Sequence, residues 1–318
     1  MSQLLCRIAK LPSSQGLCFS ELRRFSTAAT PYLLLNKTNY RAASKGEIVV
    51  DINLYDPRKD ERVKIQDQTL SEELVASVKM GSSRGWVGVK NVHDSTVRLT
   101  NVFNPCASVS SHKVITLPPL NDSRFRVVSN LCLSASPEQQ DCVVAVWSYR
   151  SLVGLCRPGD SVWTHIEVPV LASEMVYSVK DSRFYLRRVS KEDYKGLVDL
   201  INTSSGFPQV SLYQRLPNSD IPESIQDQVT STIKTQHMVE SPSGESFVVY
   251  WCKELLNREE ILSSRGKEPT SRGRRKPSGF VVFRQDLHQG IGSYTEDIGD
   301  LCIFLGKSEA FCVRISRT

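Results

Sequence analysis

The sequence predicts an all-β protein, and two observations support this prediction. Short runs of β-branched, aromatic and aliphatic residues alternate with turn residues about every 8–12 positions. In addition, turns at Asp56-Pro57, Asn104-Pro105 and Pro158-Gly159-Asp160 are about 50 residues apart, and a unit of roughly 40–50 residues with about four strands is the size of a propeller blade. Because radial closure leaves few exposed strand edges, we expect a β-propeller-like domain over residues 31–318, with a pair of β-sandwiches as the alternative.

The predicted strands follow one another from residue 47 onward. Each is a run of strand-forming residues that ends at Gly, Pro, Asn, Asp or Ser. The run at 175–179 and the run at 183–188 are expected to pair as a hairpin across Lys180-Asp181-Ser182. The full series is Glu47–Leu54, Trp86–Val92, Thr96–Val102, Val114–Leu117, Cys142–Ser148, Ser161–Val168, Met175–Val179, Arg183–Arg188, Val210–Leu216, Ser246–Trp251, Gly279–Arg284, Asp300–Leu305 and Ala310–Ile315.

Two short helices are expected among these strands. Thr69 and Glu72 have the spacing of a capping box, and apolar residues follow the helical period at positions 70, 74 and 78. A second candidate has apolar residues at positions 225, 229 and 233.

Residues 1–30 have the composition of an organelle transit peptide. Four basic residues stand against one acid, Glu21, serines are frequent, and the apolar h-region of a secretory signal does not follow the first basic residues. The run Arg23-Arg24-Phe25-Ser26-Thr27 resembles plant mitochondrial processing sites and places the cut between Phe25 and Ser26. We therefore expect a protein of the mitochondrial matrix, with the chloroplast as the alternative.

The net charge of +6 is concentrated in two segments. The leader has four basic residues and one acid and contributes +3. The segment Ser263–Ser278 has six basic residues and one acid and contributes +5, so the rest of the chain carries −2. That later segment lies in an expected insertion at about 257–278 and contains no aromatic residue. Such a segment can bind RNA, DNA or an anionic surface through phosphates without stacking on bases. Its basic residues are Arg265, Lys267, Arg272, Arg274, Arg275 and Lys276.

The remaining side chains give little support to catalytic, metal or cofactor chemistry. The seven cysteines after the leader contain no C-x-x-C pair and read as buried thiols, and no two of the five histidines have metal-ligand spacing. Neither a P-loop nor a dinucleotide fingerprint occurs, and no apolar run is long enough to cross a membrane. We therefore expect no cofactor and no metal. The histidines are His93, His112, His165, His237 and His288.

One segment matches the G-x-S-x-G pattern of hydrolases, namely Gly81-Ser82-Ser83-Arg84-Gly85. A nucleophile elbow needs a strand before the serine and a helix after it, whereas here a predicted helix precedes and a predicted strand follows. A glycine turn that leads into a strand is therefore favoured over a nucleophile at Ser83.

Two aspartates beside glycines, Asp160 and Asp300, are expected to cap their own turns. The four tryptophans at 86, 147, 163 and 251 are expected in the core.

Six sequence blocks follow one another between about residue 45 and the end of the chain. Together they resemble the plant domain-of-unknown-function family 295, the F-box-associated β-propeller relatives. The most specific is the block at 299–306, followed by Arg157-Pro158-Gly159-Asp160 with Trp163-Thr164. The blocks are Gly85-Trp86-Val87 after Gly81; Leu99–Pro105 followed by Leu117-Pro118-Pro119-Leu120; Val143–Trp147 leading into Arg157-Pro158-Gly159-Asp160 and Trp163-Thr164; Phe184-Tyr185-Leu186; Met238-Val239-Glu240-Ser241 with Gly244-Glu245; and Gly299-Asp300-Leu301-Cys302-Ile303-Phe304-Leu305-Gly306.

Typical members of that family begin with an F-box that docks a ubiquitin-ligase scaffold, and this chain has a transit leader in that place. It is similar to the organelle-directed branch of the family, which implies no ligase role. Tyr294 stands where the pattern has tryptophan. The sequence as a whole predicts a non-enzymatic protein-interaction module with an unknown organellar partner. The alternative is an organelle RNA- or DNA-associated protein that uses the basic segment.

Overall fold

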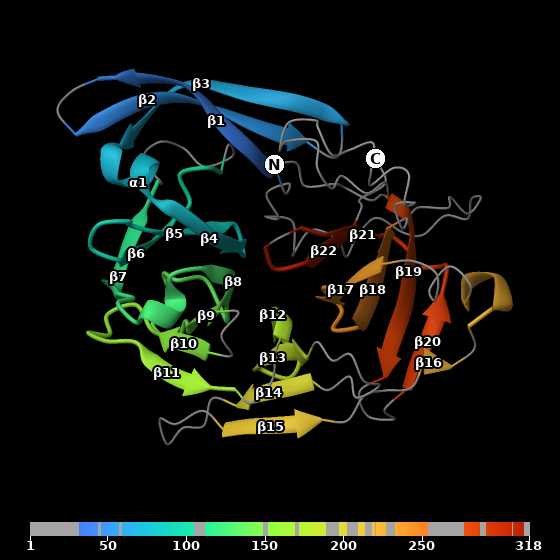
Figure 1. The fold of residues 1–318 in the computed structure, drawn as a ribbon. Coiled ribbons are helices and arrows are strands. Elements are labelled where there is room, and N and C mark those ends of the chain that lie inside the picture. Colours follow the sequence, from blue (N-terminus) through green and yellow to red (C-terminus); the bar gives the residue numbers. More distant parts are fainter. Residues whose placement is uncertain are drawn as a thin grey trace, which may run out of the picture. The chain divides into compact units, whose positions relative to one another are not determined.

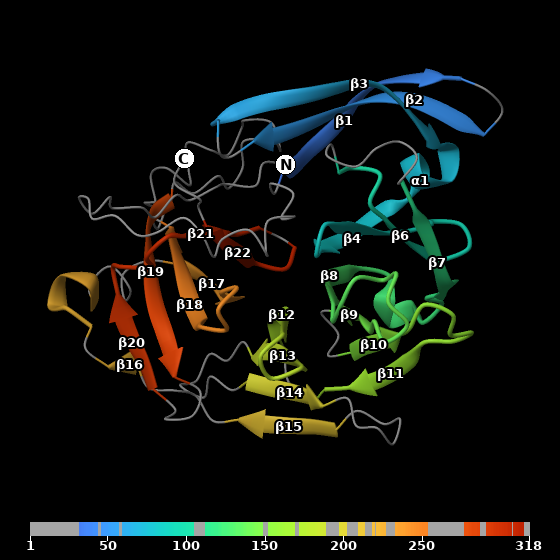
Figure 2. The same cartoon turned by 180° about the vertical axis from the view of Figure 1, so that it is seen from behind.

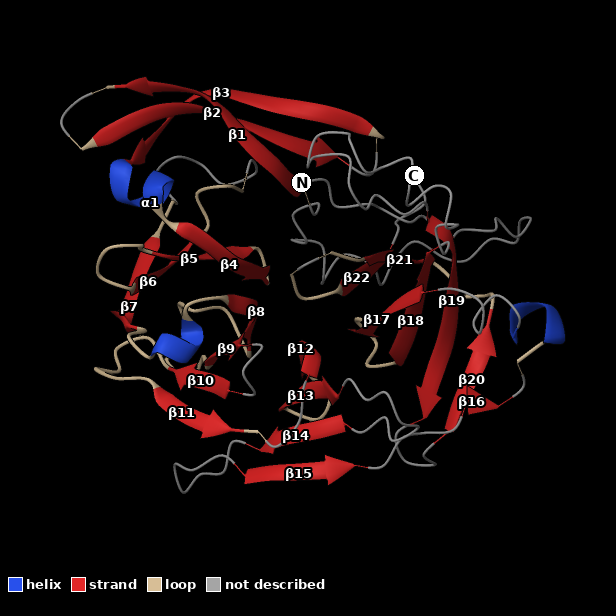
Figure 3. Ribbon diagram, viewed as in Figure 1, coloured by secondary structure: helices blue, strands red, loops and turns tan. Residues whose placement is uncertain are grey.

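The computed structural model describes residues 32–43, 46–56, 59–104, 112–148, 152–168, 172–188, 197–201, 209–213, 218–219, 221–226, 233–253, 277–286, 291–306 and 308–314. These residues belong to two compact units. Unit 1 runs through Tyr213 and takes in Phe304–Glu309, and unit 2 comprises Gln214–Ile303 and the residues from Ala310 on. Strands dominate both units (Figure 3).

Unit 1 opens with a three-stranded antiparallel sheet, and a short helix leads from it into the next sheet. The strands β1, β2 and β3 pair in chain order, so β2 is central. The apolar side chains of β2 supply the core of this region with Val50, Ile52 and Leu54. The bounds are β1 Leu33–Ala42, β2 Glu47–Asp56, β3 Glu61–Ser71 and α1 Glu72–Ala76.

Three four-stranded antiparallel meanders follow in unit 1 (Figure 1). The first strands of the three sheets lie side by side, β4 next to β8 and β8 next to β12, as Figures 1 and 2 show from opposite sides. The strands are β4 Val78–Ser83, β5 Trp86–Lys90, β6 Thr96–Thr100 and β7 Val114–Pro119; β8 Val128–Leu133, β9 Val144–Ser148, β10 Leu152–Cys156 and β11 Thr164–Glu167; and β12 Ala172–Ser178, β13 Arg183–Arg188, β14 Leu197–Ile201 and β15 Gln209–Tyr213, with the 3-10 turn η3 at Ser123–Phe125 ahead of β8.

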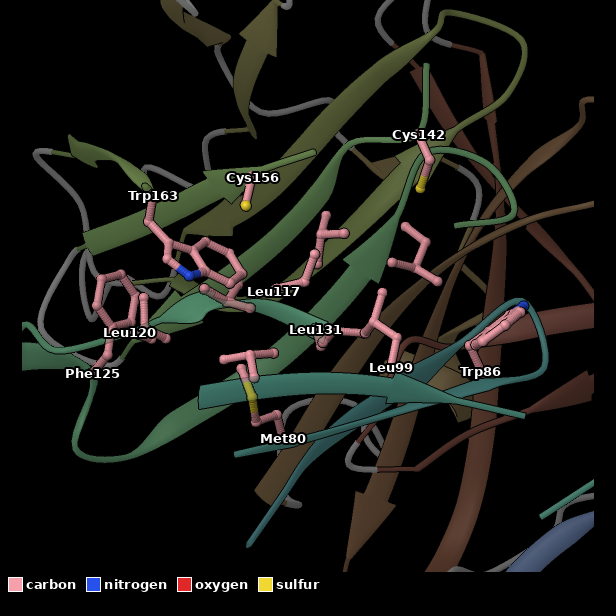
Figure 4. Close-up of a cluster of buried hydrophobic side chains, with 14 of the residues drawn as sticks. Met80, Trp86, Leu99, Leu117, Leu120, Phe125, Leu131, Cys142, Cys156 and Trp163 are labelled. Carbon is pink, nitrogen blue, oxygen red and sulfur yellow. The ribbon is translucent and has the colours of Figure 1, made fainter. Parts of the chain in front are cut away.

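Apolar side chains fill the space between the first two meanders (Figure 4). Met80 of β4, Leu99 of β6 and Leu131 of β8 are all buried there. The sheets approach so closely that a Cβ on Gly88 would lie 2.3 Å from Leu131 Cδ1. Trp163 Nε1 donates a hydrogen bond to the Pro118 carbonyl at 2.8 Å, so the buried indole has a partner in the neighbouring sheet.

Unit 2 contains a five-stranded sheet in the order β16-β20-β19-β18-β17 and the two-stranded pair β21–β22. All pairs in the larger sheet are antiparallel except β16 with β20. Tyr250, Cys252, Val281 and Phe283 form a buried apolar cluster in this unit. The bounds are β16 Asn218–Ser219, β17 Ile233–Glu240, β18 Ser246–Lys253, β19 Pro277–Asp286, β20 Ile291–Thr295, β21 Leu301–Phe304 and β22 Phe311–Arg314.

The all-β prediction is confirmed, and each of the thirteen predicted runs overlaps a strand. The 175–188 hairpin is also present, with Ser178 paired to Arg183. Among the described residues, nine further strands were not predicted, because they are short, polar or without alternation. These are β1, β3, β4, β8, β10, β14, β16, β17 and β20.

The predicted helices are shorter than expected. Residues 69 and 70 belong to β3, and α1 is capped by Ser71, whose Oγ accepts a hydrogen bond from the Leu74 amide at 3.3 Å. The ladder between β2 and β3 extends to Glu47 and Ser71, so sheet pairing prevails over the capping-box pattern, and Val78 begins β4. The second predicted helix, with apolar residues at 225, 229 and 233, is present only as a helical turn at 223–226. Ile233 instead begins β17, which pairs with β18 over its whole length.

Candidate functional site

The carboxylate of Glu309 joins the first strands of three consecutive sheets in unit 1. Ser83 Oγ, at the end of β4, donates a hydrogen bond to Glu309 Oε2. Cys132 Sγ of β8 and the Tyr177 amide of β12 donate to Glu309 Oε1, at 2.9 and 3.2 Å. We call these four residues, with Arg84, the Glu309 cluster. It gives each carboxylate oxygen at least one donor, as a buried acceptor requires.

Ser83 lies at a β-hairpin in which strands flank the turn on both sides. The two turn residues, Arg84 and Gly85, have φ angles of 51° and 81°, the left-handed pair that a two-residue hairpin turn of type I′ requires. Glycine at the second position removes the steric cost of one of them. The interpretation of this segment as a glycine turn leading into a strand is confirmed, since β4 and β5 pair through Ser83 and Trp86.

The Ser83 hydroxyl acts both as a hydrogen-bond donor and as a hydrogen-bond acceptor. It donates to Glu309 and accepts a hydrogen bond from the Leu133 amide at 3.0 Å, and the residue is 4% exposed. A nucleophilic serine needs a base that takes its proton, most often histidine. The described hydrogen-bond partners of Ser83 are Glu309 and Leu133, so the geometry is that of a structural tie between sheets.

Arg84 places a positive charge beside the cluster. Its Nε donates to the Leu133 carbonyl at 2.8 Å, and its guanidinium carbon lies 5.6 Å from the centre of the Tyr177 ring. These contacts link β4 to both β8 and β12. The Arg84 charge also favours an ionised Glu309.

Burial dominates the electrostatics of the cluster. It raises the pKa of the Glu309 carboxyl above its ordinary value, against the effect of the hydrogen bonds from Cys132, Ser83 and Tyr177. Burial, followed by the charge of Glu309, raises the pKa of the Cys132 thiol well above its ordinary value. Cys132 therefore remains a thiol that donates its proton toward Glu309, which is the opposite of an activated cysteine.

The other predicted sites fall partly outside the described residues. The leader, with Phe25 and Ser26, lies there, as do Arg265, Lys267, Arg272, Arg274, Arg275 and Lys276. β19 begins at Pro277, so the last two residues of the expected insertion belong to a strand. No helix in the described part of the chain is long and apolar enough to cross a membrane. Within the same residues, no group of three metal-ligating side chains occurs.

Asp160 caps its own turn, as expected. Its Oδ2 accepts a hydrogen bond from the Arg157 amide at 2.7 Å, and its amide donates to the Arg157 carbonyl at 3.0 Å. The expected core role holds for the tryptophans at 86, 147 and 163, which are buried, whereas Trp251 is half-buried and stacks on Phe280. The described cysteines are free, and all but Cys302 are buried.

A second feature of unit 1 is a group of exposed valines at one end of two neighbouring sheets, which we call the valine end. Val78 begins β4 and pairs with Lys90 at the end of β5, and Val92 follows two residues later. Lys90 Nζ donates to the Phe125 carbonyl at 3.1 Å, which brings this end of the sheet to the segment that holds Val127. The exposed fractions of residues 78, 92 and 127 are 59%, 54% and 62%.

Val162 is an exposed valine at the opposite end of the second meander. Val128, at the start of β8, and Leu152, at the start of β10, both pair with Ser148 at the end of β9. The starts of β8 and β10 therefore lie at the same end of that sheet. Val162 follows the far end of β10 and is 70% exposed. It therefore provides a matched reference for the valine end.

Sequence comparison assigns the chain to a family. The model of the KIB1-4 beta-propeller matches residues 54–318. This chain belongs to the KIB1-4 beta-propeller family. The part of this KIB1-4 beta-propeller chain that matches the family model begins in β2 and includes the whole Glu309 cluster. A comparison with curated proteins found no match.

Solved structures similar to this KIB1-4 beta-propeller chain have low sequence identity. A protein of unknown function from Bacteroides thetaiotaomicron VPI-5482 is 10% identical with a TM-score of 0.40; the likeness covers 82% of this chain and 58% of that one. This chain thus spans less than two thirds of the Bacteroides protein. The Cps50 (Swd1) beta-propeller domain of Myceliophteria thermophila is 8% identical with a TM-score of 0.32, and covers 82% of this chain and 98% of its own.

Glu309 was not among the residues that the sequence pointed to. It lies 226 residues beyond Ser83, in an unremarkable Ser-Glu-Ala stretch after the Gly299–Gly306 block. Only the pairing of sheets brings it to Ser83, so local pattern contains no signal for it. Ser83 was selected by its pattern, and its observed role is structural.

Proposed function

We propose that this protein is a non-enzymatic protein-interaction module of the mitochondrial matrix that binds its partner at the valine end. The observation that carries this proposal is that three exposed valines lie at the same end of two neighbouring sheets, which a Lys90–Phe125 hydrogen bond joins there. Isolated exposed apolar residues are ordinary on a protein surface, whereas a contiguous group often marks a contact site. Propellers host many unrelated functions, so the fold alone does not choose this one.

The sheets that carry the valine end are suited to present a fixed surface. At the other ends of β4 and β8 the Glu309 cluster ties three sheets together, and the space between the first two of these sheets is closely packed. A preformed surface loses little conformational freedom on binding, so apolar contacts contribute more of their free energy to affinity.

Proximity labelling in isolated plant mitochondria tests this proposal with a matched pair of variants. In one variant Val92 and Val127 are both changed to aspartate, and in the other Val162 is changed to aspartate. We expect the first to lose the labelled neighbours and the second to keep them, with unchanged unfolding temperatures in both. Equal labelling by both variants at equal stability would exclude the valine end as the contact site.

The matrix location rests on the leader and on the resemblance to the organelle-directed branch of plant family 295. Sequencing the N-terminus of the mature protein from purified mitochondria tests it, since processing after Phe25 gives a chain that starts at Ser26. Import into chloroplasts alone would overturn this part of the proposal.

The alternative proposal is RNA or DNA binding by the basic segment, which rests on six clustered cations in the sequence. Replacing Arg272, Arg274, Arg275 and Lys276 by glutamine distinguishes the two. Nucleic-acid binding predicts a salt-dependent affinity that this change weakens, whereas partner labelling through the valine end stays intact.

A further inference from the structure

Two lysines lie against the same aromatic ring in unit 1. Lys37 Nζ of β1 is 5.8 Å from the centre of the Phe103 ring, and Lys79 Nζ of β4 is 6.0 Å from it. Phe103 itself follows β6 in the turn at 101–104 and is 6% exposed. Three elements that are distant in sequence therefore bring two ammonium groups to one apolar surface.

The strand register explains why Lys37 points toward Phe103. Lys37 pairs with Ile52 of β2, and directly paired residues project from the same face of a sheet. Ile52 packs with Phe103 in one core cluster, so Lys37 shares that face. The next pair, Thr38 with Asp51, projects from the other face, which directs the Asp51 carboxylate away from Lys37.

Among the described residues, no ion pair involves Lys37 or Lys79. Two carboxylates of this region have other partners: Asp51 of β2 pairs with Lys64 at 2.8 Å, and Glu73 of α1 pairs with Arg98 at 2.6 Å. Two cations at an apolar surface without a counter-charge are unfavourable, and a bound anion relieves this cost.

The titration of the two ammonium groups agrees with this geometry. Desolvation lowers the pKa of Lys37 and, together with the charge of Lys37, lowers the pKa of Lys79 to about 8. The charge of Lys37 contributes to the lowered pKa of Lys79, so the two ammonium groups are close enough to repel each other. Lys79 is nevertheless exposed, so a ligand can reach the pair from solvent.

We propose that Lys37 and Lys79 bind the phosphate group of a small molecule beside the Phe103 ring, which both ammonium groups contact. A phosphate monoester carries nearly two negative charges near neutral pH and accepts hydrogen bonds on several oxygens, so it can satisfy both lysines at once. The source is either inorganic phosphate or a phosphate monoester. This site is independent of the valine end. It also includes a residue outside the family match, because Lys37 precedes residue 54.

Calorimetric titration of the full chain with inorganic phosphate and with phenyl phosphate tests the site. We expect Lys37→Met and Lys79→Met each to weaken binding by about tenfold or more, because each removes a charge-assisted hydrogen bond. Lys59→Met is the control: it removes one positive charge from the exposed β2–β3 turn and should leave affinity unchanged. Tighter binding of phenyl phosphate indicates a monoester as the ligand, and equal affinities indicate inorganic phosphate.

A second readout separates binding at this site from folding defects. Reductive ¹³C-methylation of the lysines gives NMR signals, and we expect phosphate to shift those of Lys37 and Lys79 while that of Lys59 stays fixed. Absence of phosphate binding by the folded wild-type chain, or equal affinity in all three variants, overturns the proposal.

Discussion

Ser83 donates a hydrogen bond to Glu309 across 226 residues of sequence, and the same carboxylate accepts from Cys132 and the Tyr177 amide. One acidic side chain thus serves donors from the first strands of three sheets. The net free energy of each hydrogen bond is modest, whereas buried donors left without an acceptor cost more. Glu309 therefore stabilises the fold mainly because it prevents that cost.

Replacing Glu309 by alanine is expected to lower the free energy of unfolding by roughly 2–3 kcal/mol, because it strands several donors in the interior. Glu309→Gln keeps one carbonyl acceptor and should lose clearly less. Urea unfolding followed by circular dichroism measures both. Equal losses in the two variants would show that packing, and not hydrogen bonding, is the contribution of this side chain.

Ser83→Ala is expected to cost about 1–3 kcal/mol of stability, since the Leu133 amide loses its acceptor and Glu309 loses a donor. Ser82→Ala is the matched control one residue away, where the side chain is only half-buried. We expect hydrolysis of p-nitrophenyl esters to be the same for wild type and both variants. Ester turnover that only the Ser83 variant loses would revive the nucleophile hypothesis.

Asp51 makes the first sheet sensitive to acid. Hydrogen bonds from Lys64, the Asp67 amide and Asn39 lower the pKa of Asp51 from 3.8 to about 2. A lowered pKa in the folded state means that Asp51 stabilises the fold above its ordinary pKa and loses that contribution as pH falls through about 2. We expect Asp51→Asn to be less stable than wild type at pH 7, and the difference to shrink between about pH 4 and pH 2 in urea unfolding. A pH-independent difference would contradict the titration.

Gly154 lies where the second meander has no room for a side chain. A Cβ there would be 3.0 Å from Val146 Cγ2, 3.2 Å from Phe125 Cζ and 3.3 Å from Trp163 Cε3. Because these neighbours are buried, Gly154→Ala should destabilise the protein by about 1–3 kcal/mol. The control Thr164→Ala, exposed on the same sheet, should change stability by less than about 1 kcal/mol. Thermal unfolding compares the two.

Strand positions could be predicted where the sequence carries a strong local pattern. β9, with its continuous apolar run, and the β12–β13 hairpin are such cases. β8 and β10 were missed because Val128–Leu133 and Leu152–Cys156 are short and mix small and polar residues with apolar ones. The ladder between β2 and β3 likewise overrode a capping signal at Thr69, since pairing with a whole strand outweighs one local cap.

The site was less predictable than the fold. Ser83 was singled out by a hydrolase pattern, and only the hairpin geometry shows why glycine follows it. Glu309 and the Lys37–Lys79 pair have no local signature, because their neighbours come from sheets far away in sequence. Which polar side chains meet across sheets is determined by register and by sheet-to-sheet packing, neither of which a single sequence displays.

The late position of Glu309, far beyond the strands that it joins, has a consequence for the order of folding. When β4, β8 and β12 have already been made, their shared acceptor still awaits more than a hundred further residues. Until then the Ser83 hydroxyl, the Cys132 thiol and the Tyr177 amide lack that acceptor. The strands of the three meanders that begin with β4, β8 and β12 therefore precede their shared acceptor in the chain, and the ties among these sheets are complete only when Glu309 has joined them.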